Sequence, residues 1–175
     1  KSIKQGEQSI LRCPGIFDVM KRGFIVPMWY DVKITTDPAK TGFAWEIASS
    51  EFQRMTEMEV ITTHGNGILQ NLPQRNDRLR EIVKINVPWH VKSPVPLMFM
   101  PIPYTDDFDF ESTIGLLEPW KSDELNAQLY WRKLEGTRLL KAGTPLYQLI
   151  PLTNEDVEFE VRDANEDDKK WLKKK

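Results

Sequence analysis

The chain has 175 residues, of which 40% are hydrophobic and 29% charged, and this is the usual composition of one globular domain with a sizeable core. Lysine and arginine number 24 against 26 aspartates and glutamates, so a formal charge of −2 offers no excess of positive charge to attract a nucleic acid. The apolar runs are far shorter than the roughly 20 residues that cross a bilayer. These values predict a protein with neither a nucleic acid nor a membrane as its partner.

The first residues predict an arm followed by a short helix. Lys1 to Glu7 are polar and lack the apolar core of a signal peptide, which predicts a cytoplasmic protein. After an arm over residues 1–12, the segment 13–23 has a proline in its first turn, basic residues in its last turn and a glycine at its end, as short helices do. The single cysteine, Cys13, excludes an internal disulfide, and we expect it to be half-buried and structural rather than nucleophilic.

Short stretches rich in β-branched and aromatic residues recur from residue 24 onward, separated by turn residues. This spacing is typical of antiparallel sheets, and the long helices that a parallel βαβ sheet requires are missing. The sequence therefore predicts an all-β fold, mostly antiparallel and of sandwich, jelly-roll or β-clip type, with short N-terminal and C-terminal helices. We expect strands at 24–26, 30–35, 43–47, 60–63, 82–87, 97–100, 113–117, 125–132, 138–140, 146–152 and 157–161.

Several connecting segments carry their own signals. Residues 51–59 are compatible with a helical turn or a loop, whereas His64 to Gly67 has the glycines and asparagine of a tight turn. A cluster of prolines would remove ladder donors from a central strand, so we expect edges, bulges or loops there, with a peptide-binding groove as the less favoured alternative. The prolines of this cluster are Pro88, Pro94, Pro96, Pro101 and Pro103.

The end of the chain predicts a terminal helix. Asp163 is followed three residues later by Glu166, which is the spacing of a capping box, and lysines follow toward the finish. We therefore expect one domain, made of the arm 1–12, a β-rich body 13–162, and a C-terminal helix with a lysine tail over 163–175.

The sequence contains no motif of the large enzyme classes. No nucleophile elbow, phosphate-binding loop or dinucleotide fingerprint is present. The only histidines, His64 and His90, would need carboxylates such as Glu46, Glu59 or Glu118 to bind a metal. Hydrogen-bonded structural histidines are favoured over metal ligands. The sequence thus assigns no metal and identifies no cofactor.

Aromatic and amide side chains beside polar residues are the candidates for binding a ligand, because such pairs suit pockets and interfaces. Along residues 126–132, alternate positions share a face, so one face is expected to join the core and the other to bind or to meet water. The acidic run Asp106 to Glu111 is expected to be an exposed loop entering a strand. The candidate binding residues are His64, Trp89, His90, Glu118, Trp120, Asn126, Gln128 and Gln148.

Parts of the chain resemble two known families. The stretch from His64 to Leu152 resembles a family of bacterial and marine phage proteins to which no function is assigned, and the segment from Cys13 to Val26 is similar to the start of related cyanophage proteins. The pieces that carry the first resemblance are His64–Leu69, Pro88-Trp89 with Lys92 and Pro94, Glu118 with Trp120, Asn126 with Trp131, and Gly143–Pro151.

A second likeness is confined to ten residues. Lys141–Ile150 is similar to a strand-turn-strand of the dUTP pyrophosphatases, which are trimeric β-rich enzymes. The phosphate motif of that family, with its serine and arginine, is absent from this chain. The resemblance therefore implies a related fold without nucleotide hydrolysis.

These features predict a binding or assembly protein of phage or bacterial origin, in the cytoplasm or, for a phage protein, in the host cytoplasm or the virion. Sheets of this kind can pair with copies of themselves, so a homo-oligomer is expected. The alternative is a small-molecule or metal-dependent enzyme with a pocket near His64, His90, Glu118 and Trp120. Convergence of these side chains would favour the enzyme, and a flat apolar patch would favour assembly.

Overall fold

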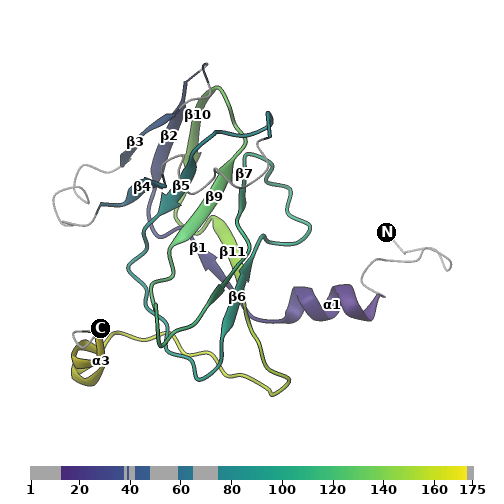
Figure 1. The fold of residues 1–175 in the computed structure, drawn as a ribbon, viewed down its shortest axis with the longest axis vertical. Helices are drawn as coiled ribbons and strands as arrows, with labels where there is room; N and C mark the ends of the chain where they lie inside the picture. Colours follow the sequence, from purple (N-terminus) through teal and green to yellow (C-terminus); the bar gives the residue numbers. More distant parts are fainter. Residues whose placement is uncertain (1–12, 38, 40–41, 48–58, 65–74, 173–175) are drawn as a thin grey trace, which may run out of the picture.

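The computed structural model describes residues 13–37, 39, 42–47, 59–64 and 75–172. Within these residues, the strands form three antiparallel sheets, and one short helix lies toward each end (Figure 1). The predicted fold class, mostly antiparallel β with short N-terminal and C-terminal helices, is confirmed. No helix of the described segments is both long and apolar enough to cross a membrane.

Sheet A has the strand order β1-β11-β6-β8, so β6 is an inner strand. Pro96 and Pro101 stand on either side of β6, and each proline of the predicted cluster lies outside the strands. Because the flanking prolines take no donor from the ladder, β6 pairs on both edges, with β11 and with β8. The bounds are β1 Phe24–Pro27, β11 Pro145–Pro151, β6 Leu97–Met100 and β8 Gly115–Leu117.

Sheets B and C have the orders β10-β2-β3 and β4-β5-β9-β7. In β2 and β9 every second residue is buried, which confirms that Ala127, Leu129 and Trp131 face the core. Their bounds are β10 Gly136–Leu140, β2 Val32–Thr36, β3 Phe43–Ile47, β4 Ile61–His64, β5 Ile82–Ile85, β9 Ala127–Trp131 and β7 Phe110–Ser112.

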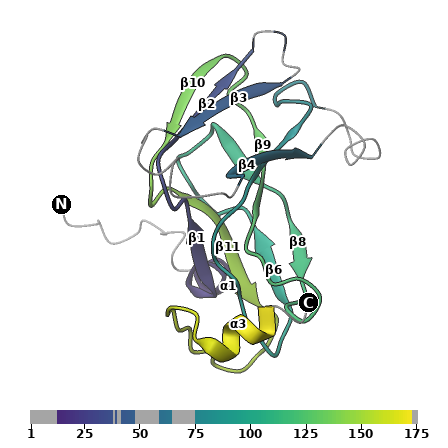
Figure 2. The same ribbon diagram turned by 90° about the vertical axis from the view of Figure 1, so that its left-hand side faces the viewer.

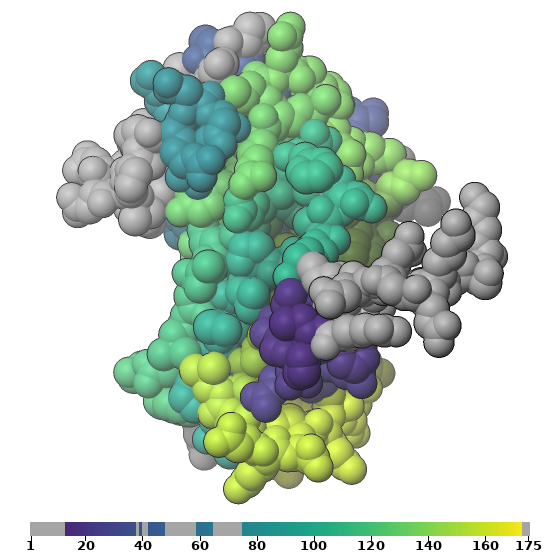
Figure 3. Space-filling view, turned by 90° about the vertical axis from the view of Figure 1, so that its right-hand side faces the viewer, coloured from purple at the N-terminus to yellow at the C-terminus, as the bar shows by residue number. Residues whose placement is uncertain are grey.

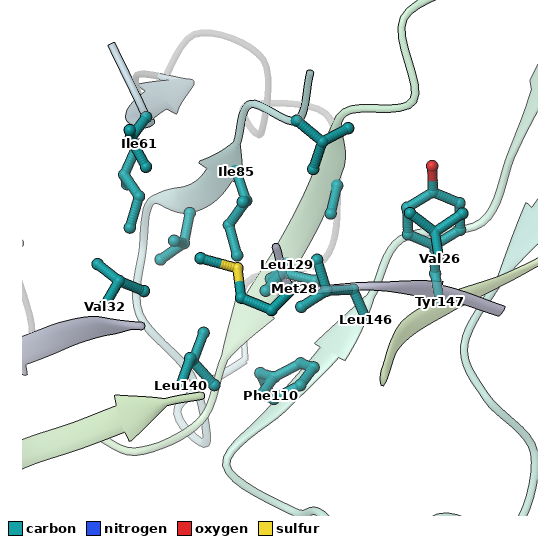
Figure 4. Close-up of a cluster of buried hydrophobic side chains, with 14 of the residues drawn as sticks. Val26, Met28, Val32, Ile61, Ile85, Phe110, Leu129, Leu140, Leu146 and Tyr147 are labelled. Carbon is teal, nitrogen blue, oxygen red and sulfur yellow. The ribbon is translucent and has the colours of Figure 1, made fainter. Parts of the chain in front are cut away.

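One hydrophobic cluster joins the three sheets. Figure 4 shows Met28 between Leu140 of sheet B, Leu129 of sheet C and Leu146 of sheet A. Met28 is 1% exposed and lies just after β1, where its N–H donates to the carbonyl of Thr144 at 2.7 Å. The chain therefore passes from sheet A to sheet B through the centre of the core.

The helix α1, Pro14–Lys21, matches the predicted helix, but none of its residues is buried. The side-chain amide of Gln148, on β11, donates to the carbonyl oxygens of Val19, at 2.8 Å, and of Arg22. Cys13 is exposed, so the expectation of a half-buried cysteine is wrong. The helix extends away from the sheets (Figure 1), and Cys13, at its N-terminal end, is exposed to solvent.

The helix α3, Glu166–Leu172, lies beneath sheet A (Figure 2). Its capping box is formed by Asn165 and Asp168: the side chain of Asn165 accepts from the N–H of Asp168 at 2.9 Å, and that of Asp168 accepts from the N–H of Asn165 at 3.0 Å. The predicted box at Asp163 and Glu166 is therefore displaced by two positions. Asp168 is preferred because Lys92 and Arg162 also bind its carboxylate.

The predicted strand at 157–161 is wrong. These residues form an irregular, exposed segment, in which Phe159 stacks on Phe24 at a centroid distance of 3.8 Å. Side-chain stacking, rather than a backbone ladder, holds this segment against sheet A. Residues 51–58, for which a helical turn or a loop was expected, and residues 65–67 of the expected tight turn lie outside the described residues.

Candidate functional site

Two neighbouring segments, 86–91 and 118–126, contain five of the eight candidate residues. The N–H of Leu125 donates to the carbonyl of Trp89 at 3.2 Å, and the N–H of Val91 donates to the carbonyl of Asp123 at 2.8 Å. His90 pairs with Glu124 between these bonds. The candidates in these two segments are Trp89, His90, Glu118, Trp120 and Asn126, and those at the bonds between the segments are Trp89, His90 and Asn126.

His90 and Asp123 form a pair with the geometry of an oriented base. Nδ1 of His90 lies 2.8 Å from Oδ2 of Asp123, and the two side chains are 38% and 10% exposed. A buried carboxylate on one ring nitrogen fixes the imidazole, and the other nitrogen can then exchange a proton. Catalysis would also need a nucleophile or a substrate proton within reach. In the described part of the chain no serine, threonine or cysteine hydrogen-bonds to His90, so the pair joins the two segments without completing a catalytic set.

The other candidates in these segments contact residues close to them in the chain, the neighbouring segment or the core. The carboxylate of Glu118 lies 2.6 Å from Nζ of Lys121, and the side chain of Asn126 accepts from the N–H of Val87 at 3.2 Å. Trp89 packs against the core, whereas Trp120 is 50% exposed. These contacts stabilise the turn at 118–121 and the pairing of the two segments. The ring of Trp120 stays exposed.

His64 is the last residue of β4, whereas His90 lies beyond the other end of this strand, opposite Glu124. His64 pairs with Ile82, at the start of β5, and Ile61 pairs with Ile85, at its end. From Ile85 the chain continues past the start of β4, where the N–H of Asn86 donates to the carbonyl of Val60, and only then reaches His90. A site built on both histidines is therefore not formed.

Gln128 and Gln148 lie on separate sheets. Gln128 is on the outer face of β9, opposite Lys84 of β5, and Gln148 is the buried anchor of α1. Among the described residues, no group of three or more histidine, cysteine, aspartate or glutamate side chains is placed to hold a metal ion. The eight candidates thus divide between several places.

A different part of the molecule contains a pocket of about 180 Å³, which we name the loop pocket. Loop 101–109, which connects β6 to β7, forms one side of it, and strand β7 and the start of β11 form the others. Strand β7 is an edge strand of sheet C. Figure 3 looks onto this face, where the teal loop lies above the purple helix α1. The lining residues are Pro101, Ile102, Tyr104, Thr105, Asp107, Phe108, Phe110, Glu111, Ser112, Arg132, Pro145 and Leu146.

Ser112 is a lining residue of the loop pocket with a buried hydroxyl. The residue is only 3% exposed, and its Oγ is buried with no hydrogen-bond partner among the described residues. A buried hydroxyl without a partner costs roughly 1–3 kcal/mol, and such groups are rare in folded proteins. One lining residue of the loop pocket therefore contains a buried hydroxyl that no described residue satisfies.

The charged residues of the wall are paired. Arg132, which follows β9, binds the carboxylate of Glu111 on the neighbouring strand β7. Asp107 lies 2.7 Å from the guanidinium of Arg138, which also binds Asp109 at 3.0 Å. The wall consequently presents donors and acceptors without an unpaired charge among its lining residues.

Loop 101–109 is held by hydrogen bonds within the loop and to the residue that follows β9. The carbonyl of Asp109 accepts from the N–H of Arg132 at 2.7 Å, and the N–H of Asp109 donates to Oδ1 of Asp107 at 3.1 Å. Tyr104 has φ +58°, a conformation that costs a residue with a side chain roughly 1–2 kcal/mol. Its ring is 61% exposed, and that of Phe108 is 71% exposed. Strained backbone of this kind persists where the surroundings fix it and is common at binding sites.

The arrangement is suited to binding. The loop pocket combines aromatic rings, a buried hydroxyl and an arginine–glutamate pair, and these are the elements of sites that orient a small ligand. The sequence indicated only part of it: the acidic run was expected to be a loop entering a strand, as it is. Its partners Arg132 and Arg138 lie far along the chain, and no local pattern marks Ser112.

Comparison with family models, with curated proteins and with solved structures found no match to this chain. The likeness to the phage family and the likeness to the dUTP pyrophosphatases therefore stay predictions.

Proposed function

We propose that this protein is a binding protein that holds a small molecule, or a small part of a larger one, in the loop pocket. The observation that carries the proposal is Ser112, a lining residue of the cavity, whose hydroxyl is buried without a partner in the described part of the chain. A bound ligand would supply the missing hydrogen bond. The proposed site is the loop pocket, which none of the eight candidate residues lines.

Two further features of the loop pocket support binding. Tyr104 and Phe108 expose large rings to solvent. Exposure of this apolar surface to water is unfavourable in the free protein, and a ligand that covers the rings removes that cost. The strained φ of Tyr104 is maintained by a loop that Arg138 anchors. A ring held in this way loses little conformational freedom on binding.

A screen of small metabolites by protein-observed NMR tests the proposal. We expect ligands to shift the amide signals of loop 101–109 and β7. The substitution Ser112→Ala should weaken binding at least tenfold, and the stability of the ligand-free protein should stay the same or rise by about 1 kcal/mol, because no internal hydrogen bond is lost. Shifts centred on residues 118–126 instead would contradict the loop pocket and favour the His90 region.

In a second variant, Tyr104→Gly, we expect binding to weaken without a loss of stability. Glycine adopts positive φ without strain, so the free energy of unfolding should be unchanged or higher, while loss of the ring should weaken the ligand. Trp120→Ala removes an equally exposed ring outside the loop pocket and is the matched control. Equal loss of binding in both variants would argue against the site.

A further inference from the structure

The size of the loop pocket limits what it can hold. Its volume of about 180 Å³ is below the roughly 300 Å³ at which drug-sized sites begin. A protein cavity of about 150 Å³ takes up benzene. The loop pocket therefore fits one six-membered ring with small substituents, rather than a nucleotide or a peptide segment.

The charges of the wall indicate a neutral ligand. Asp107, Glu111 and Arg132 are the charged residues that line the loop pocket, and each lies in an ion pair within the described structure. A cationic or anionic ligand would have to compete with the guanidinium or the carboxylate that already neutralises its partner. A ligand without charge leaves these pairs in place.

The polar groups of the wall are both donors and acceptors. The hydroxyl of Ser112 can do either, the guanidinium of Arg132 has donors beyond those used by Glu111, and the carboxylate of Glu111 has further lone pairs. A purely apolar ring would bury these groups without partners, which is unfavourable. A ligand that matches the wall thus carries several groups that donate and accept together, as hydroxyl groups do.

The rim of the loop pocket is aromatic. Tyr104 and Phe108 are exposed flat rings on the loop, and Phe110 lies deeper, 6% exposed. Aromatic faces pack against C–H groups through dispersion and carry a negative quadrupole that attracts them. A ligand that is polar around its edge and has C–H groups on its faces satisfies both the rim and the wall.

We infer that the loop pocket binds a single pyranose unit, a neutral polyhydroxylated ring, either as a free sugar or as a residue of a glycan. The inference rests on the proposed function and specifies its ligand class. The ring would stack on Tyr104 or Phe108 and direct hydroxyl groups toward Ser112, Arg132 and Glu111.

Ligand-observed saturation-transfer NMR on the full chain tests this class. The probes are glucose, galactose, mannose, N-acetylglucosamine and rhamnose, with acetate, choline and cyclohexanol as charged and apolar comparisons. We expect a saturable signal from at least one pyranose. Its dissociation constant should rise at least tenfold in Phe108→Ala and in Ser112→Ala and should change less than twofold in Trp120→Ala.

The binding data distinguish loss of the sugar class from loss of the loop pocket as a site. If no pyranose binds and a comparison probe binds in a way that the two pocket variants weaken, the sugar class is overturned and the proposed function stands. If no probe binds, or if the variants leave pyranose binding unchanged, both are overturned. Because Phe108 is 71% exposed, its replacement removes little packing, and retained folding is checked from the amide spectrum.

Discussion

At the scale of single residues, Gly23 is fixed by both conformation and space. Its φ is +76°, and a Cβ at this position would overlap the carbonyl oxygen of Leu149 on β11. We expect Gly23→Ala to lower the free energy of unfolding by about 2–4 kcal/mol, because the strand pairing of β1 with β11 must shift to admit the methyl group. Urea denaturation followed by circular dichroism measures the change.

Gly143→Ala is the matched control for that variant. Gly143 also has a positive φ, +87°, but no atom lies within 4 Å of the position of an added Cβ. Its replacement should cost only the conformational term, about 1 kcal/mol. Equal losses in the two variants would show that the structure relaxes around Gly23 and that the overlap carries no cost.

His64 is a second residue with a measurable property. Partial burial first, and then the charge of Lys84, lower the pKa of His64 below its ordinary value of 6.5. The folded chain thus holds this proton more weakly than the unfolded chain. The resulting stability is present above pH 6.5 and is lost as the pH falls through the lowered pKa.

An NMR titration of the imidazole signals tests this prediction, with His64→Gln used to assign them. We expect the midpoint of His64 below pH 6.5. Lys84→Gln should raise this midpoint only in part, because burial is the larger cause. A midpoint at or above 6.5 in the unmodified protein would contradict the burial of the ring.

At the scale of elements, α3 depends on one carboxylate. Hydrogen bonds from Arg162, from Lys92 and from the N–H of Asn165 hold the pKa of Asp168 far below its usual range. We expect Asp168→Asn to release α3, because the substitution removes the charge that joins the helix to residue 92. Hydrogen exchange of the amides in 166–172 should accelerate, while exchange in the sheets stays unchanged.

Asp167→Asn provides the control, since Asp167 is exposed in the same turn and, among the described residues, pairs only with Lys170, at 3.2 Å. In the unmodified protein the contribution of Asp168 is present above the ordinary aspartate pKa and is lost in acid, as the pH falls toward the lowered value. Protection of α3 that is equal in both variants would mean that Trp171, rather than Asp168, docks the helix.

The elements that the sequence predicted well are those with an unambiguous local pattern. Phe43–Ile47 and Leu97–Met100 were placed at the observed bounds, because alternation defines the first and prolines delimit the second. Segment 157–161 also alternates, yet it forms no strand, and Phe159 stacks on the ring of Phe24 instead. Local β-propensity cannot distinguish these cases, since it reports side-chain packing more than backbone pairing.

The loop pocket was beyond prediction for a related reason. Its ion pairs join residues 21 and 31 positions apart, Glu111 with Arg132 and Asp107 with Arg138. The expected candidates were chosen from local patterns, and three of them, His90, Asn126 and Gln148, hydrogen-bond to another segment of the chain. Which polar groups remain without a partner is decided only when the sheets pack together.

At the scale of the whole molecule, the shared core predicts a single unfolding transition. Leu129 is fully buried at the centre of the cluster that joins the three sheets. We expect Leu129→Ala to cost about 2–5 kcal/mol and to shift tryptophan fluorescence and far-ultraviolet circular dichroism together. Gln128→Ala, next to it on the outer face of β9, should change stability by less than about 0.5 kcal/mol. Separate transitions for the two signals would show that the sheets unfold independently.

The anchoring of loop 101–109 has a consequence for the speed of recognition. Arg138 binds two aspartates of the loop, so the rings of Tyr104 and Phe108 are already positioned before a ligand arrives. Association then needs no slow rearrangement, and we expect related ligands to share nearly the same association rate constant. Their affinities would differ almost wholly in how long each complex lasts.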